Sequence, residues 1–164
     1  MRMKRILLLA LLAPAALGAA VITTHRFSAA APKSGLAGNG ITDIARSGGH
    51  LWLGTGNGLS RLDLATGQFS SFTPTQGLGH GSVSALWAHG DTVIVATATD
   101  TVTSADPAPL PKGTGISFSF DSGATWRRSS QPGSTPIQNL TYDIAVFAGT
   151  VWITSYGGGV LKSP

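Results

Sequence analysis

One short run of polar residues in the second half of the chain has types and spacing that could do chemistry. Ser119, Asp121, Gly123 and Thr125 alternate along this run, and Trp126 follows directly. A carboxylate at a turn can accept hydrogen bonds from backbone N–H groups of that turn, and a tryptophan can fill the space between neighbouring sheets. We therefore interpret this run as a structural hairpin rather than as a catalytic site.

Other residues that could bind a ligand lie far apart in the sequence. Trp87 and Tyr156 are candidate binding residues, because an aromatic ring at the mouth of a channel can stack on a sugar ring. For the tryptophans, packing between sheets is the first interpretation. The four histidines contain no pair at the close spacing of metal ligands, and the chain has no Cys. We therefore expect neither a metal nor a cofactor.

The charge distribution argues against a nucleic-acid partner. The chain of 164 residues carries 11 Lys and Arg against seven Asp and no Glu, for a formal charge of +4. Three of the basic residues are Arg2, Lys4 and Arg5, so the remainder of the chain is close to neutral. A protein that binds nucleic acid gathers its basic residues on one face or along one stripe. No nucleic-acid partner is therefore expected.

The first 22 residues are typical of an export signal. Three basic residues precede an uncharged, almost wholly apolar stretch at 6–22, and small residues precede two candidate cleavage sites after Ala20 and Ala30. The alternative is an uncleaved anchor, for which this stretch is marginally short. Residues 23–34 are expected to form a flexible leader. Both alternatives place the rest of the chain outside the cytoplasm, with the membrane as a partner only through an uncleaved anchor.

The rest of the chain is a repeat. Residues 35–44 align with residues 77–86 at an offset of 42, and their glycine, leucine and aliphatic positions coincide. A third copy begins at Thr141, and its larger offset leaves an insertion in the second unit. The proline-rich stretch at 106–111 is the clearest part of this insertion, and we expect it to form an exposed loop.

Within each unit the apolar residues follow a period of two, which predicts short strands joined by tight turns. The 22 glycines supply residues for these reversals. The expected strands span 41–46, 50–55, 58–63 and 68–72 in the first unit, 82–88, 92–98, 115–120 and 125–128 in the second, and 141–147, 150–155 and 159–162 in the third. The fold is therefore predicted to be all-β. A four-stranded antiparallel meander repeated at this period is typical of a β-propeller blade.

Two motifs resemble those of known families. The segment 35–63, which includes Leu51-Trp52-Leu53-Gly54-Thr55, resembles the two-component-regulator propeller repeat, found in extracytoplasmic sensor regions and exported bacterial proteins. The run from Ser119 to Trp126 is similar to the Asp-box, the neuraminidase-repeat hairpin of bacterial sialidases and sortilin-like propellers. These resemblances cover residues 35–164 and imply a β-propeller, with the Asp-box on a peripheral hairpin away from the central channel.

The chain holds fewer blades than a closed propeller. We expect blades at about 35–76 and 77–138 and an incomplete one at 139–164, which is two and a half to three blades. Closed propellers have about four to eight blades, and a partial array leaves one sheet face uncovered at each end. We therefore expect an incomplete propeller. Its remaining blades would lie in a longer chain, or the chain would form an oligomer.

The resemblance to sialidases does not bring catalysis with it. Sialidase catalysis needs an arginine cluster, a Tyr–Glu nucleophile pair and an Asp acid. Asp43, Arg46, Arg61 and Tyr142 are present, but the chain has no Glu and no Arg-Ile-Pro motif. We therefore expect no catalytic residues.

The leading hypothesis is an exported, non-catalytic β-propeller segment that serves as a scaffold for binding a protein or a glycan. The insertion at 99–114 is the expected contact, because loops on a rigid scaffold often carry recognition. Two alternatives stay open. One is a fragment of a sialidase-like, glycan-active propeller whose catalytic residues lie in further blades. The other is the periplasmic sensor region of a two-component regulator.

Overall fold

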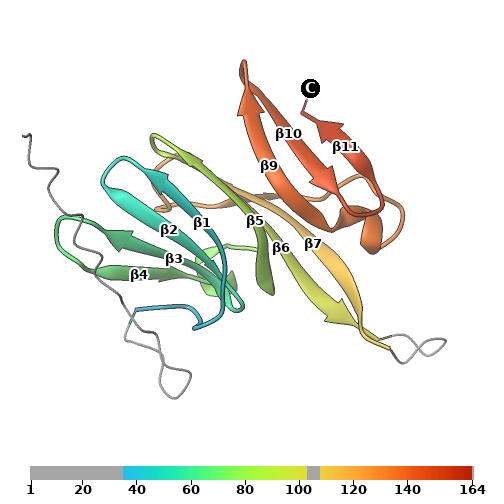
Figure 1. Cartoon of the computed structure of the whole chain (residues 1–164), viewed down its shortest axis with the longest axis horizontal. Coiled ribbons are helices and arrows are strands. Elements are labelled where there is room, and N and C mark those ends of the chain that lie inside the picture. Colours follow the sequence, from blue (N-terminus) through green and yellow to red (C-terminus); the bar gives the residue numbers. More distant parts are fainter. Residues whose placement is uncertain (1–34, 103–107, 164) are drawn as a thin grey trace, which may run out of the picture.

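The computed structural model describes residues 35–102 and 108–163. The predicted signal segment at 1–22 and the leader at 23–34 lie outside these residues. The described chain is all-β and forms three antiparallel sheets joined by short 3-10 turns, which confirms the predicted fold class at this level (Figure 1).

Each sheet is a meander in which consecutive strands are neighbours. The first sheet contains β1 (Ile41–Ser47), β2 (His50–Thr55), β3 (Gly58–Asp63) and β4 (Phe69–Phe72). The second sheet contains β5 (Ser82–His89), β6 (Thr92–Thr101), β7 (Leu110–Ser119) and β8 (Arg127–Ser129). The third sheet contains β9 (Thr141–Phe147), β10 (Thr150–Ser155) and β11 (Gly159–Lys162). The 3-10 turns η1 (Pro74–Gln76) and η2 (Ile137–Asn139) connect one sheet to the next.

The sequence repeat recurs in the backbone. In every sheet the pairing of the first two strands shifts by one residue, at Thr42, Ser84 and Tyr142. These positions keep the sequence offsets of the repeat. A β-bulge bends its strand and increases the local twist. The three sheets therefore share one local geometry as well as one sequence pattern.

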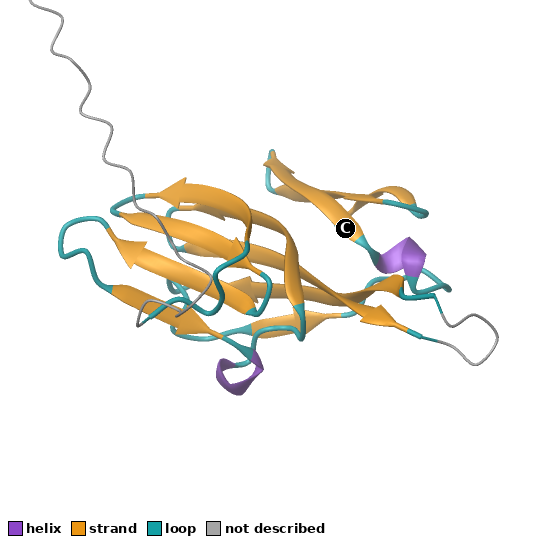
Figure 2. Ribbon diagram, turned by 60° about the horizontal axis from the view of Figure 1, so that its bottom comes forward, coloured by secondary structure: helices purple, strands orange, loops and turns teal. Residues whose placement is uncertain are grey.

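The sheets stack face to face (Figure 2). They follow one another in chain order, and the first strands β1, β5 and β9 are neighbours (Figure 1). Two apolar layers hold the stack together, since burial of apolar surface is the main stabilising term in such packing. The layer between the first and second sheets contains Trp52, Leu59, Phe72, Leu78, Val83, Leu86, Val93 and Val95. The layer between the second and third sheets contains Ala85, Ile94, Ala96, Ile116, Ile144 and Ile153.

The insertion in the second unit differs from the expected loop. Its two ends continue β6 and β7 as a two-stranded extension, in which Thr99 pairs with Lys112 and Thr101 pairs with Leu110. Pro111 lies within this extension opposite Asp100. The fourth strand, β8, stops opposite Ile116, so the extension is an edge with a single neighbour, where proline is tolerated. Prolines alone therefore gave the wrong loop boundaries.

Candidate functional site

The predicted Asp-box residues form a closed hydrogen-bonded turn between β7 and β8. Asp121 Oδ1 accepts hydrogen bonds from the Ser119 hydroxyl at 2.8 Å and from the Thr125 backbone N–H at 2.8 Å. The Ser119 Oγ in turn accepts the Gly123 N–H at 2.8 Å. The hydroxyl of Thr125, its backbone N–H and then the Ser119 hydroxyl hold the pKa of Asp121 below its ordinary value of 3.8. The Asp121 carboxylate therefore accepts its hydrogen bonds from within the turn.

The same hairpin fastens the second sheet to the first. Trp126 lies edge-on to Phe72 with the ring centres 5.6 Å apart. A Cβ on Gly123 would lie 2.8 Å from the Phe72 ring, so this close approach requires glycine. Arg61 donates from Nη1 to the Ser122 carbonyl at 2.7 Å, while its guanidinium lies 5.7 Å from the centre of the Trp52 ring. The hairpin therefore contributes contacts between the first and second sheets.

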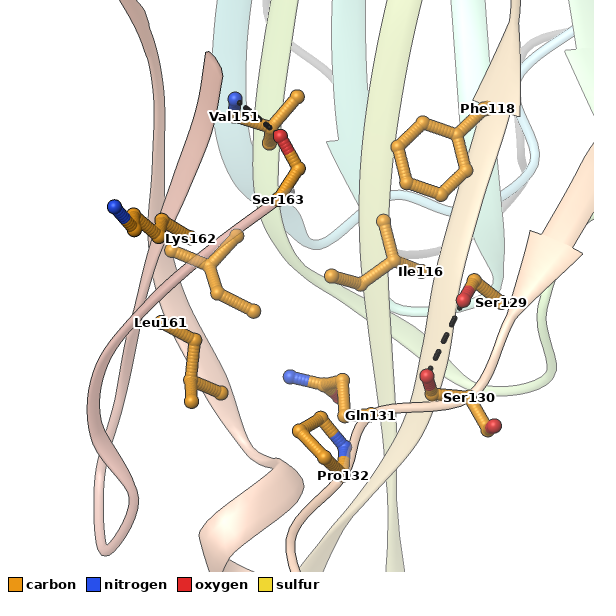
Figure 3. A pocket seen from close by; sticks show the side chains of 11 residues that line it. Ile116, Phe118, Ser129, Ser130, Gln131, Pro132, Val151, Leu161, Lys162 and Ser163 are labelled. Carbon is orange, nitrogen blue, oxygen red and sulfur yellow. Dashed lines mark hydrogen bonds between the residues drawn. The ribbon is translucent and has the colours of Figure 1, made fainter.

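A cleft of about 280 Å³ opens between the second and third sheets (Figure 3). Ile116 and Phe118 of β7 form one wall, and Val151, Ile153 and Leu161 of the third sheet form the facing wall. The rim is polar and contains Ser129, Ser130, Gln131, Lys162 and Ser163. An apolar interior with a few polar groups at its edge is the usual composition of a binding pocket.

Strand register explains why this cleft is open. In the first sheet Phe72 pairs with Leu59, and at the equivalent place in the second sheet Ser129 pairs with Ile116. Phe72 is buried against Trp126, whereas Ser129 is exposed. As far as the structure describes it, the third sheet has no fourth strand to supply a counterpart of Trp126. The cleft is the space that two aromatic rings fill in the preceding interface.

Gln131 gives the cleft a specific polar group. Its Nε2 donates to the Thr141 hydroxyl at 2.5 Å, which fixes the side chain beside the third sheet. Its Oε1 is buried, and no donor in the described part of the chain reaches it. A buried acceptor without a partner costs free energy, roughly 1–3 kcal/mol.

Trp87 and Tyr156, the two candidate binding aromatics, do not form one site. Trp87 lies near the β5–β6 turn, packs in the layer between the second and third sheets, and has its ring centre 6.0 Å from that of His89. Tyr156 is exposed in the turn between β10 and β11 of the third sheet, with Tyr142 edge-on at 5.7 Å. Trp87 therefore contributes to packing, and Tyr156 lies apart from it.

The residues that could have resembled a sialidase centre do not converge either. Arg61 lies between the first and second sheets, whereas Arg46 is on the outer face of the first sheet and Tyr142 is on the third. Asp43 Oδ2 accepts the backbone N–H of Leu86 at 2.8 Å and so links the first two sheets. Each of these side chains has a separate environment.

Comparison with protein-family models gives no match, and comparison with curated proteins gives none either. Within residues 35–102 and 108–163, no helix is long and apolar enough to cross a membrane. Over the same ranges, no group of three or more His or Asp side chains is arranged to hold a metal ion. The cleft is the feature from which a function can be inferred.

Sequence reasoning missed the cleft. Its walls consist of ordinary strand residues, and nothing in a linear pattern distinguishes Ile116 or Phe118 from the rest of the core. The usable signal is the contrast between Phe72 and Ser129 at the equivalent strand position. The predicted fourth strand at 125–128 ends one residue before Ser129, so the prediction contains no counterpart of Phe72 in the second sheet.

Proposed function

We propose that the three sheets are consecutive blades of an incomplete β-propeller and that the chain is an exported, non-catalytic scaffold. In this proposal a partner protein inserts an apolar side chain into the cleft between the second and third sheets. The observation that carries the proposal is the cleft itself, because the same interface is filled by Phe72 and Trp126 one sheet earlier. Export rests on the sequence at 1–22.

The chemistry of the lining favours a peptide over a glycan. Phe118 is the one aromatic ring among the described lining residues, and the remaining wall residues are aliphatic. The cleft volume is near the lower end of small-ligand pockets, roughly 300 Å³, and suits one side chain.

Two observations on acidic residues support the non-catalytic part of the proposal: the hydrogen bonds of Asp121 and the absence of Glu. Asp121 is held by Ser119 and Thr125 and has its pKa lowered, so it is unsuited to donate a proton as a general acid near neutral pH. The chain has no Glu to form a Tyr–Glu nucleophile pair. The Asp-box here acts as a turn and as an anchor for Trp126.

A binding screen with a variant whose cleft is filled tests this function. The purified chain is applied to a phage library of random peptides and, separately, to a glycan array. Ser129→Phe places a ring where Phe72 stands in the first sheet. Val102→Phe is the matched control, because Val102 is exposed just after β6 and does not line the cleft. We expect peptides with an apolar anchor residue to bind the wild type and V102F but not S129F.

Three results would contradict the proposal. Peptide ligands that bind S129F as tightly as the wild type would place the site outside the cleft. Glycans that bind the wild type and lose binding in S129F would replace the protein partner with a carbohydrate. A fluorogenic sialoside hydrolysed by the purified chain would overturn the non-catalytic assignment.

A further inference from the structure

The face of the first sheet that the second sheet covers has a defined set of side chains. Ala45, Trp52 and Arg61 lie in one row across β1, β2 and β3, and Leu59 follows in the next row. Trp52 is 1% exposed and Leu59 is fully buried, because the second sheet packs on both. The Arg61 guanidinium lies 5.7 Å from the centre of the Trp52 ring.

The open face of the third sheet repeats this set. Ala145, Trp152 and Lys162 lie in one row across β9, β10 and β11, and Val160 follows in the next row. The Lys162 ammonium lies 5.8 Å from the centre of the Trp152 ring, as Arg61 lies over Trp52. In the third sheet, however, Trp152 is 38% exposed and Val160 is 64% exposed. A face built for sheet packing is therefore uncovered.

The outer face of the first sheet has the complementary side chains. Ile44 occupies the repeat position of Leu86 and Ile144, which are buried against the preceding sheet at 7% and 4% exposure. Ile44 is 59% exposed. Ile41 likewise matches Val83 and is exposed where Val83 is buried. The open face of the third sheet and the outer face of the first sheet therefore have the side chains of the two sides of the internal interface, and they lie at opposite ends of the stack.

We infer that the open face of the third sheet binds the outer face of the first sheet of a second copy, so that two copies associate head to tail. The occupant is a second copy because Ile44 has the same place in the repeat as Leu86 and Ile144. Those two residues pack against the preceding sheet at the two interfaces within the chain. Two copies bring six sheets together, within the roughly four to eight that close into a ring. This interface is separate from the cleft, and its closure into a ring of six sheets rests on the proposed propeller architecture.

The internal interface indicates where a cross-link should form. A Cβ built on Gly54 would lie 3.0 Å from the Val83 Cβ across the first and second sheets. By the repeat, Thr154 stands at the position of Gly54 and Ile41 at that of Val83. Thr154 has a Cβ of its own, so the two sheets must sit slightly farther apart. The spacing then approaches the roughly 3.5–4.5 Å between the Cβ atoms of a disulfide.

The test uses full chains with one cysteine each, which is possible because the natural chain has none. Copies with T154C and copies with I41C are purified with different tags, mixed and oxidised by air. We expect a disulfide-linked product that contains both tags and has twice the mass of one chain. Leu64→Cys replaces Ile41→Cys in the control, because Leu64 is exposed in the turn between β3 and β4. That mixture should remain largely unlinked.

Complementation of two surface variants gives an independent measurement. Ile44→Asp and Trp152→Asp should each give monomers on gel filtration with light scattering, and the control Leu64→Asp should keep the wild-type dimer. A mixture of I44D and W152D should recover a dimer, since one interface between them has both faces intact. A monomeric wild type or an unchanged dimer in W152D would overturn the inference. In the cross-linking experiment, disulfides between two T154C copies that form as fast as those between T154C and I41C would also overturn it.

Discussion

At the scale of single residues, the chain uses aspartate to close turns. Asp121 accepts hydrogen bonds from Ser119 and Thr125 between β7 and β8. Asp63 does the same between β3 and β4, where its Oδ1 accepts the Thr66 backbone N–H at 2.8 Å. The backbone N–H of Thr66, followed by its hydroxyl, contributes most to holding the pKa of Asp63 below 3.8. Both carboxylates stabilise the folded state only while they are ionised.

Asp121→Asn should lower the stability of the chain in a pH-dependent way. The pKa of Asp121 is lower in the folded state than in the unfolded chain, so its contribution is fully present above the unfolded value, about 3.9. That contribution is lost as the pH falls through the lower folded-state pKa. The melting temperatures of wild type and D121N should therefore differ at neutral pH and converge in strong acid.

Asp100→Asn is the control for this measurement. Asp100 is exposed on the extension of β6, and its side chain makes no hydrogen bond within the described residues. Its replacement should leave the melting temperature unchanged at neutral pH. A D121N curve that stayed parallel to the wild type down to the lowest pH would contradict the role assigned to the Asp121 charge.

At the scale of elements, position in the stack decides what one residue type contributes. Trp52 and Trp152 occupy the same place in β2 and β10, each opposite an alanine of the preceding strand and a basic residue of the following strand. Trp52 is covered by the second sheet, whereas Trp152 is 38% exposed. β2 and β10 are equivalent strands, so the difference in tryptophan exposure comes from the presence or absence of a neighbouring sheet.

Trp52→Ala and Trp152→Ala therefore form a matched pair. Truncation of a buried tryptophan costs about 3–5 kcal/mol, and truncation on a surface costs about 0.5 kcal/mol. Urea denaturation of dilute protein, with the copies apart, should show a large loss for W52A and a loss of about 1 kcal/mol or less for W152A. Equal losses would mean that the third sheet is covered within the single chain.

The elements were predictable from the sequence to the extent that local pattern determines them. The eleven strands predicted for the repeat all occur in the described part of the chain, because alternation and glycine turns specify them. The extension at 99–101 and 110–114 was not predictable, because proline marks a break in a linear reading while an edge strand accommodates it.

The site was predictable only in part, for a physical reason. The hairpin from Ser119 to Trp126 has its chemistry in adjacent residues, so its turn could be foreseen. The cleft depends on which residue stands opposite Ile116 and on how the second and third sheets face each other. Those are properties of pairing and packing, and a serine such as Ser129 looks unremarkable until its register is known.

At the scale of the whole molecule, the same packing arrangement recurs between successive sheets. Phe72 and Trp126 fill the interface between the first and second sheets, and the interface between the second and third sheets has a cleft beside Ser129. One further sheet face is exposed at each end of the described stack. Stability in stacked repeats comes largely from contacts between neighbours. The proposed binding cleft and the proposed contact between copies are thus two incomplete versions of the same packing.

The melting temperature of Ser129→Phe tests this repeated interface most directly. If Ser129 stands where Phe72 stands one sheet earlier, a phenylalanine there fills the cleft and buries apolar surface between the second and third sheets. A gain of about 1 kcal/mol corresponds to a rise of about 4 °C for a domain of this size, and the exposed control V102F should not change. A melting temperature that rises in S129F alone is the expected result. A fall, or an equal change in both variants, would contradict the equivalence of the two interfaces.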